Sequence, residues 1–169
     1  MTPGAGATVF YLKGFLKQGF AVARESRRMG CLEHPKSRNY AMIRHYQPNC
    51  IDESAAPFSQ VVIDDHFAHL AGLVAADFPD GIAVLGEPGH ETRAVMTMIG
   101  KILQELDMTM EDIVRTDVHL ANLDDFDAMD VAYREFFEPG KYPARTTTQS
   151  SRLFGDSLVE ITCMARLPG

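Results

Sequence analysis

One charged residue in an otherwise apolar stretch near the end of the chain is the first candidate for chemistry. Glu160 stands in Leu158-Val159-Glu160-Ile161-Thr162-Cys163-Met164-Ala165, where both alternating faces are mostly apolar, as in a strand covered on two sides. An isolated buried carboxylate is costly, so Glu160 needs a partner or a functional role. Arg145 opens the preceding expected strand and is the obvious partner. If the two strands pair as antiparallel neighbours, Arg145 and Glu160 can meet.

Two interpretations of this pair are open from the residues alone. A structural ion pair at the edge of a sheet would satisfy both charges. Alternatively, the planar guanidinium of Arg145 would bind the carboxylate of a ligand in bidentate fashion, next to a glutamate that is free to act as a base. Thr147 lies on the same strand face as Arg145.

The elements that must position these residues alternate between strands and helices. Val95, Ile99, Ile102 and Leu106 recur at helical spacing and predict a helix from about His90 to Asp107. A second helix follows Asn122, a plausible N-cap. The expected strands are two short ones between Phe58 and Ala75, then Ile113 to Leu120, Ala144 to Ser150 and Leu158 to Leu167. This order predicts an α+β domain, a mixed sheet with both helices on one face.

Composition and charge exclude several classes of function. The chain of 169 residues has a net charge of -7, which argues against nucleic acid as the main partner. No apolar run approaches the roughly 20 residues that span a bilayer, so we expect no membrane partner. Three scattered cysteines favour a reducing cytoplasm over a disulfide framework. The histidines and acids share no ligand spacing, so no metal site is expected.

The N-terminal segment has a different composition from the rest of the chain. Residues 1–41 carry seven basic and two acidic side chains, which leaves nine basic and twenty-one acidic side chains for residues 42–169. We interpret 1–41 as a dispensable extension or a start assigned too early, and 42–169 as the working domain. Organelle targeting by the basic, serine-containing extension is the less favoured alternative.

Several motifs occur in order along the domain. Phe58 to Leu167 is similar to the Rid family (YjgF-type), and the segments that carry the resemblance are Pro57-Phe58-Ser59-Gln60, Ala71-Gly72-Leu73, Val114 to Phe126, Pro143-Ala144-Arg145-Thr146-Thr147-Thr148-Gln149 and Val159-Glu160-Ile161. The separation of the arginine and the glutamate matches that of the family.

The resemblance implies a fold, a reaction and roles for individual residues. It implies a fold of the chorismate mutase type, homotrimers with sites between subunits, and hydrolytic deamination of 2-imino acids or enamine carboxylates, with neither metal nor cofactor. Arg145 would hold the substrate carboxylate, and Glu160 would activate the attacking water. Phe58, Gly72 and Thr147 would line the pocket.

The chain departs from the family pattern at three positions around the expected site. Phe58 replaces a tyrosine, and Ala71 and Leu73 replace a serine and a glutamine, so we expect a less polar pocket wall and a bulkier or more apolar imino acid. Thr147 stands where many members have a cysteine. These replacements keep a second hypothesis open, a non-catalytic module that binds a small carboxylate metabolite or regulates a partner enzyme.

Overall fold

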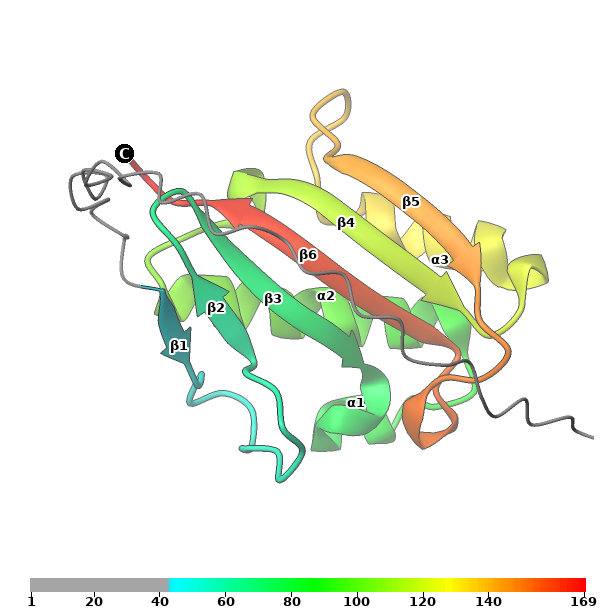
Figure 1. Cartoon of the computed structure of the whole chain (residues 1–169). Coiled ribbons are helices and arrows are strands. Elements are labelled where there is room, and N and C mark those ends of the chain that lie inside the picture. Colours follow the sequence, from blue (N-terminus) through cyan, green and yellow to red (C-terminus); the bar gives the residue numbers. More distant parts are fainter. Residues whose placement is uncertain (1–42) are drawn as a thin grey trace, which may run out of the picture. The chain divides into compact units, whose positions relative to one another are not determined.

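The computed structural model describes residues 43–169, so the extension expected at 1–41 lies outside the described residues. Four short 3-10 turns accompany six strands and three α-helices in this part of the chain (Figure 1). The elements are, in order, β1 Arg44–Tyr46, β2 Val61–Ile63, β3 Phe67–Val74, α1 Pro79–Ile82, α2 Pro88–Glu105, β4 Ile113–Leu120, α3 Phe126–Arg134, β5 Ala144–Gln149 and β6 Val159–Arg166.

The strands form one mixed sheet in the order β1-β2-β3-β6-β4-β5. All neighbours are antiparallel except β4 and β5, which are parallel. The expected pairing of β5 with β6 is therefore wrong, because β4 lies between them. The chain leaves β4, crosses through α3 and returns in the same direction as β5, which is the connection that parallel strands require. It then reverses and enters the sheet on the other side of β4 as β6.

Helices α2 and α3 lie behind the sheet, on one of its two faces (Figure 1). The apolar stripe of α2 is completely buried there at Val95, Ile99 and Ile102. Burying each such side chain contributes about 1.5–3 kcal/mol, so this stripe holds the helix to the sheet. The α+β architecture with both long helices on one face is confirmed. None of the helices in residues 43–169 is long and apolar enough to cross a bilayer.

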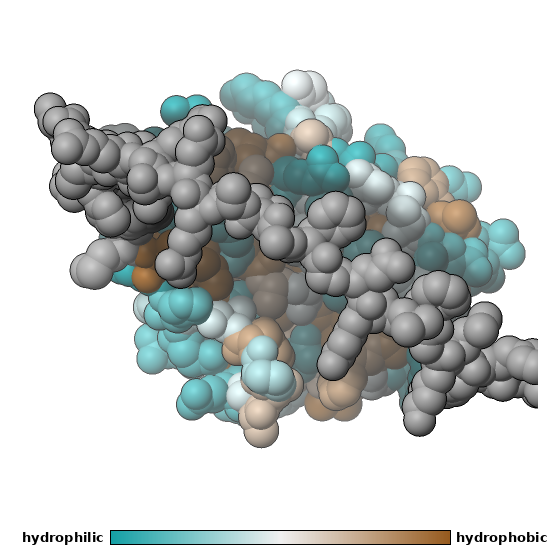
Figure 2. All heavy atoms as spheres, viewed as in Figure 1, coloured by the Kyte–Doolittle hydropathy of each residue, from teal (hydrophilic) through white to brown (hydrophobic). Residues whose placement is uncertain are grey.

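The alternation of β6 decides which way its side chains point. Val159, Ile161, Cys163 and Ala165 are buried towards the helices. Because successive strand residues point to opposite faces, Glu160 projects from the face that the helices leave uncovered. Figure 2 views the molecule as in Figure 1 and shows hydrophilic and hydrophobic residues side by side on the visible surface.

A buried carboxylate on α2 fixes the start of β6. Glu91 is fully buried. Its Oε2 accepts hydrogen bonds from the backbone N–H groups of Leu158 and Val159, at 2.7 and 3.3 Å, and its Oε1 accepts one from Gly86 at 2.8 Å. Three backbone donors satisfy a carboxylate that would otherwise be costly to bury. The backbone directly before Glu160 is thereby held to the helix layer.

Candidate functional site

Arg145 lies on the helix side of the sheet. It pairs with the buried Thr116 of β4, so both side chains point towards α3. The Arg145 Nη2 donates a hydrogen bond of 2.8 Å to Oδ1 of Asp130, and the guanidinium carbon lies 4.8 Å from the centre of the Tyr133 ring and 5.5 Å from that of Phe126. Arg145 is thus oriented by one ion pair and two cation–π contacts.

Asp130 is shared between two arginines. Its carboxylate pairs with Arg145 and also with Arg134, one helical turn further along α3. Burial acts to raise the pKa of Asp130, but the hydrogen bonds from Arg134 and Arg145 outweigh it and hold that pKa below its ordinary value. The carboxylate is therefore charged under neutral conditions and keeps Arg145 in place.

A cavity of about 330 Å³ opens at this cluster. Arg145 and Arg134 line it together with Asp130, Tyr133 and Tyr142. Two guanidinium groups against one carboxylate leave the lining with one uncompensated positive charge. This cavity is therefore suited to a monoanion such as a carboxylate, and the side chain of Arg145, 21% exposed, can contact it.

Glu160 belongs to a different cavity on the opposite face. On β6 it pairs with Val74 of β3 and with His119 of β4. A register shift between Leu70 and Leu73 in β3 brings Gly72 against the carboxylate, so that a Cβ at Gly72 would lie 2.1 Å from Oε1 of Glu160. Only a glycine leaves room for the glutamate in its present position.

The Glu160 cavity has a volume of about 450 Å³. Phe58, half exposed, and Gln60 line it from the loop before β2, while Gly72 and Glu160 line it from β3 and β6. Carboxylates complete much of the remaining lining, at Asp52, Glu53 and Asp77. This cavity is thus acidic, in contrast to the Arg145 cavity.

The structure does not bring the two central candidates together within one chain. Arg145 sits opposite Thr116 and Glu160 opposite His119, on the two strands that flank β4. At ordinary strand spacing their Cα atoms are about 14 Å apart, and their side chains point to opposite faces. The ion pair between Arg145 and Glu160 that the sequence left open is therefore excluded in the single chain.

The remaining candidates divide between these two groups. Thr147 lies on the Arg145 side, and its Oγ1 is buried without a hydrogen-bond partner in the described residues. Gly72 and Phe58 lie with Glu160. Leu73 is completely buried in the hydrophobic core, so the expectation that it lines the pocket wall is wrong. It pairs with Ile161, whose side chain faces the helices.

Asp130 is the residue that the sequence interpretation missed. Its position among Asp124, Asp125 and Asp127 suggests one more solvated acid at a helix start. A clearer signal exists in the spacing, since Asp130 follows Phe126 by four residues and precedes Tyr133 by three. That spacing puts all three side chains on the stripe of α3 that faces the sheet.

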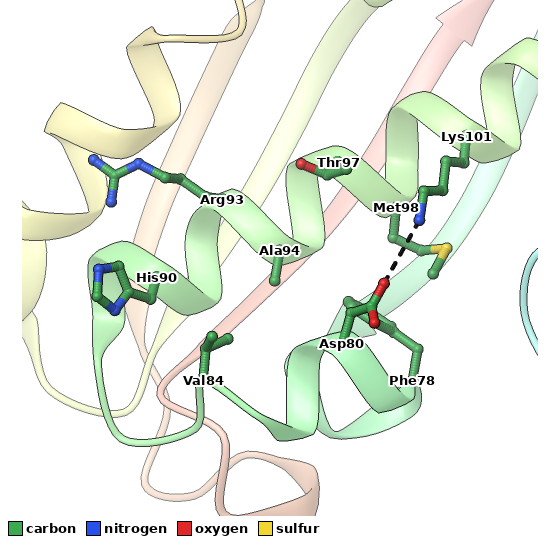
Figure 3. Close-up of a pocket in the computed structure, with 9 residues that line it drawn as sticks. All are labelled: Phe78, Asp80, Val84, His90, Arg93, Ala94, Thr97, Met98 and Lys101. Atoms are coloured by element: carbon green, nitrogen blue, oxygen red, sulfur yellow. Dashed lines mark ion pairs between the residues drawn. The ribbon is translucent and has the colours of Figure 1, made fainter.

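A third cavity, of about 400 Å³, contains none of the predicted site residues (Figure 3). It lies between α1 and α2, where the Lys101 Nζ is 3.8 Å from a carboxylate oxygen of Asp80. Its other strong cation, Arg93, donates to both carboxylate oxygens of Glu135, at 2.8 and 2.6 Å. Both cations are thus paired, and we assign this cavity no ligand.

Residues 43–169 contain no cluster of three or more His, Cys, Asp or Glu side chains that could hold a metal ion.

Comparison with known proteins identifies a family and several relatives that resemble this chain in sequence. Residues 50–167 match the family model described as Endoribonuclease L-PSP. A RutC family protein of Synechocystis is 37% identical over 114 residues, which cover 66% of this chain and 87% of that protein. The human 2-iminobutanoate/2-iminopropanoate deaminase is 29% identical over 109 residues, which cover 64% of this chain and 79% of that protein.

Solved structures share the fold at lower identity. A protein of the Rid family from Yersinia pestis superposes with a TM-score of 0.68 at 22% identity, over 75% of this chain and all of that chain. RidA from an Antarctic Psychrobacter has a TM-score of 0.66 at 21% identity, over 73% of this chain and 99% of the other.

Proposed function

This chain belongs to the endoribonuclease L-PSP family, the family of the Rid proteins, and from that premise we propose that it hydrolyses 2-imino acids or their enamine tautomers to 2-keto acids and ammonia. Relatives between 29% and 31% identical are named 2-iminobutanoate/2-iminopropanoate deaminases, which supports imine deamination at the level of the family. The observation that carries the proposal is the coexistence of a positively charged arginine cavity with a glutamate that is held against Gly72 and forms no ion pair in the described residues.

The arginine cavity would hold the substrate by its carboxylate. Asp130 fixes the guanidinium of Arg145 from one side, which lowers the entropic cost of aligning it with an incoming carboxylate. Thr147 lies next on the same strand face, and it is not among the residues that line this cavity in the single chain. Orientation of the electrophilic carbon relative to one water molecule can then supply much of the rate acceleration.

Glu160 would act on that water. As the water oxygen attacks the imine carbon, Glu160 takes up a proton and the C=N double bond becomes a single bond. Glu160 returns that proton to the nitrogen, which gives a carbinolamine. It then carries the hydroxyl proton of the carbinolamine to the nitrogen, so that the C–N bond breaks, ammonia leaves and the carbonyl forms. One water is consumed and the carboxylate is regenerated. General acid–base catalysis of this kind contributes typically 10²–10⁴-fold.

Because Arg145 and Glu160 lie on opposite faces of one chain, a complete site requires two chains. We propose a homotrimer in which the Arg145 cavity of one subunit faces the Glu160 cavity of the next. Partly buried side chains such as Val62, Phe67 and Met164 on the uncovered sheet face support this assembly, since contact with a second subunit would bury them.

An imine-decay assay tests the function. 2-Iminobutyrate or 2-iminopropionate is generated by an amino-acid oxidase, and semicarbazide traps the imine that remains. We expect wild-type protein to speed imine loss and both Arg145→Ala and Glu160→Gln to lower kcat/KM by about 100-fold or more. Arg152→Ala and Glu111→Gln, exposed residues outside the site, are matched controls that should keep full activity. Equal decay with wild-type protein and with buffer overturns the deaminase proposal for these substrates.

Phe58, which lines the Glu160 cavity, stands where the family has a tyrosine, and the lost hydroxyl favours the second candidate, a non-catalytic module that binds a small carboxylate. Binding of a 2-keto acid, measured by calorimetry, separates the two. In a deaminase, Glu160→Gln abolishes turnover but retains binding through Arg145. In a binding module, wild-type protein binds the acid without accelerating imine loss.

A further inference from the structure

Arg134 is a second cation in the wall of the Arg145 cavity. It is the last residue of α3, and its side chain is 57% exposed. Its Nη2 donates a hydrogen bond to Oδ2 of Asp130, while the Nη2 of Arg145 donates to Oδ1 of the same carboxylate at 2.8 Å. Asp130, only 18% exposed, therefore bridges the two guanidinium groups and holds both at one cavity.

The net charge of this cavity depends on Arg134. Arg145 and Asp130 by themselves form a neutral ion pair, which has little attraction for an anion. The rest of the lining is uncharged, so Arg134 supplies the one positive charge that is left over. A ligand carboxylate that approaches Arg145 thus meets a net positive charge only because Arg134 shares Asp130.

Both guanidinium groups keep hydrogen-bond donors for a ligand. An arginine side chain has five N–H donors. Within residues 43–169, Arg145 uses one of them, at Nη2, and Arg134 donates from Nε to the carbonyl oxygen of Asp130 and from Nη2 to its carboxylate. A carboxylate has two oxygens and can accept hydrogen bonds from two donors at once. Two arginines at one cavity can therefore hold one carboxylate between them.

We propose that Arg134 is a second substrate-binding residue, which takes one oxygen of the substrate carboxylate while Arg145 takes the other. This inference rests on the proposed imine hydrolysis and concerns its binding step alone. The carboxylate is common to 2-imino acids and to the 2-keto acids they yield. Arg134 would therefore strengthen the binding of substrate and product over that of neutral analogues.

A matched pair of ligands isolates the carboxylate. 2-Oxobutanamide replaces the carboxylate of 2-ketobutyrate with a neutral group of nearly the same shape, and calorimetry measures the Kd of each. We expect Arg134→Gln to raise the Kd of 2-ketobutyrate about tenfold, the loss of one partly exposed charged hydrogen bond, and to leave binding of the amide unchanged. The difference between wild type and variant should shrink as salt is added.

Two further variants separate this role from others. Arg134→Lys keeps the positive charge but loses the planar fork, so its Kd should lie between those of wild type and Arg134→Gln. Arg152→Gln is the matched control, because Arg152 is exposed, pairs with a carboxylate four residues away at Asp156, and lines neither cavity. It should bind 2-ketobutyrate like wild type.

The thermal midpoint and the mass of the native assembly are measured for each variant. An exposed ion pair one helical turn apart adds little to stability, so Arg134→Gln should keep both values close to wild type. Weaker binding that comes with a lower mass assigns Arg134 to a subunit contact and overturns the binding role. An unchanged Kd for 2-ketobutyrate, or equal weakening of acid and amide, overturns it as well.

The imine-decay assay on the same proteins distinguishes this inference from the proposed function. If wild-type protein binds 2-ketobutyrate through Arg134 but does not speed imine loss, the deaminase proposal fails and the role of Arg134 stands. If wild-type protein speeds imine loss and Arg134→Gln keeps its full kcat/KM, the role of Arg134 fails and the deaminase proposal stands.

Discussion

Glu160 keeps its position because the residue beside it has no side chain. The close approach of Gly72 to Oε1 of Glu160 is a requirement for space, since Gly72 is not among the residues with a positive φ. The atom that a methyl group would strike is the far end of a flexible side chain. A larger residue at position 72 therefore moves the carboxylate more readily than the backbone.

We predict that Gly72→Ala lowers activity strongly while leaving the fold intact. The added Cβ displaces the Glu160 carboxylate from its present position, and misplacement of the proposed catalytic group by about 1 Å can cost on the order of 100-fold. Imine decay and the thermal midpoint are measured together. Gly100→Ala is the control, because its Cβ would meet only Met110 Sδ at 3.5 Å, and it should keep full activity. An active Gly72→Ala protein would contradict the role given to this contact.

At the scale of elements, one carboxylate at the end of α2 secures the segment that leads out of β1. Glu105 accepts hydrogen bonds from the backbone N–H groups of Asn49 and Cys50, both at 2.8 Å, and from the hydroxyl of Tyr46 at 2.9 Å. The bond from Asn49 is the largest cause that lowers the pKa of Glu105 to about 2, and those from Cys50 and Tyr46 add to it against the opposing effect of burial. This contact fixes the start of the loop that carries Asp52 and Glu53 to the Glu160 cavity.

The depressed pKa of Glu105 gives a prediction for stability against pH. Its folded pKa of about 2 lies below the ordinary value of 4.5, so its contribution is complete above pH 4.5 and is lost as the pH falls towards 2. We expect Glu105→Gln to lower the thermal midpoint at pH 7, and the difference from wild type to shrink between pH 4.5 and 2. A difference that stays constant over this interval would assign the effect to packing. Glu111→Gln should show none.

How much of the fold follows from the sequence depends on the range of the interactions. The bounds of β4 at Ile113 and Leu120 were predicted because its alternation is local, and α2 was predicted to within two residues at each end. The pairing of β5 was not, since strand order depends on how the chain crosses the sheet through α3. The motifs indicated Arg145 and Glu160, but their opposite faces follow from the register, because they lie opposite Thr116 and His119, which are an odd number of residues apart on β4.

At the scale of the whole molecule, the central proposal is that each working site takes Arg145 from one copy and Glu160 from another. The family match over residues 50–167 falls inside the domain proposed at 42–169, and residues 1–41 remain a proposed extension. A homotrimer of this kind is a closed ring in which every copy contributes both halves, each to a different site.

Mixing two inactive variants tests this arrangement. Arg145→Ala and Glu160→Gln proteins are unfolded together and refolded in equal amounts. With random assembly, about one quarter of the sites receive Arg145 from one variant and Glu160 from the other, so about a quarter of wild-type activity should return. Each variant refolded alone is the control. If no activity returns although mixed oligomers are shown by mass spectrometry, the two residues do not share a site between subunits.

The two cavities also differ in how far apart their lining residues lie in the sequence. The lining of the Arg145 cavity comes from residues 130–145, which belong to α3, the turn after it and the start of β5, whereas the lining of the Glu160 cavity is drawn from residues between Ile51 and Glu160. The loop between β1 and β2 supplies Asp52 and Glu53 to the Glu160 cavity and lines no part of the Arg145 cavity. Changes in that loop could therefore alter one cavity while the residues that form the other stay the same.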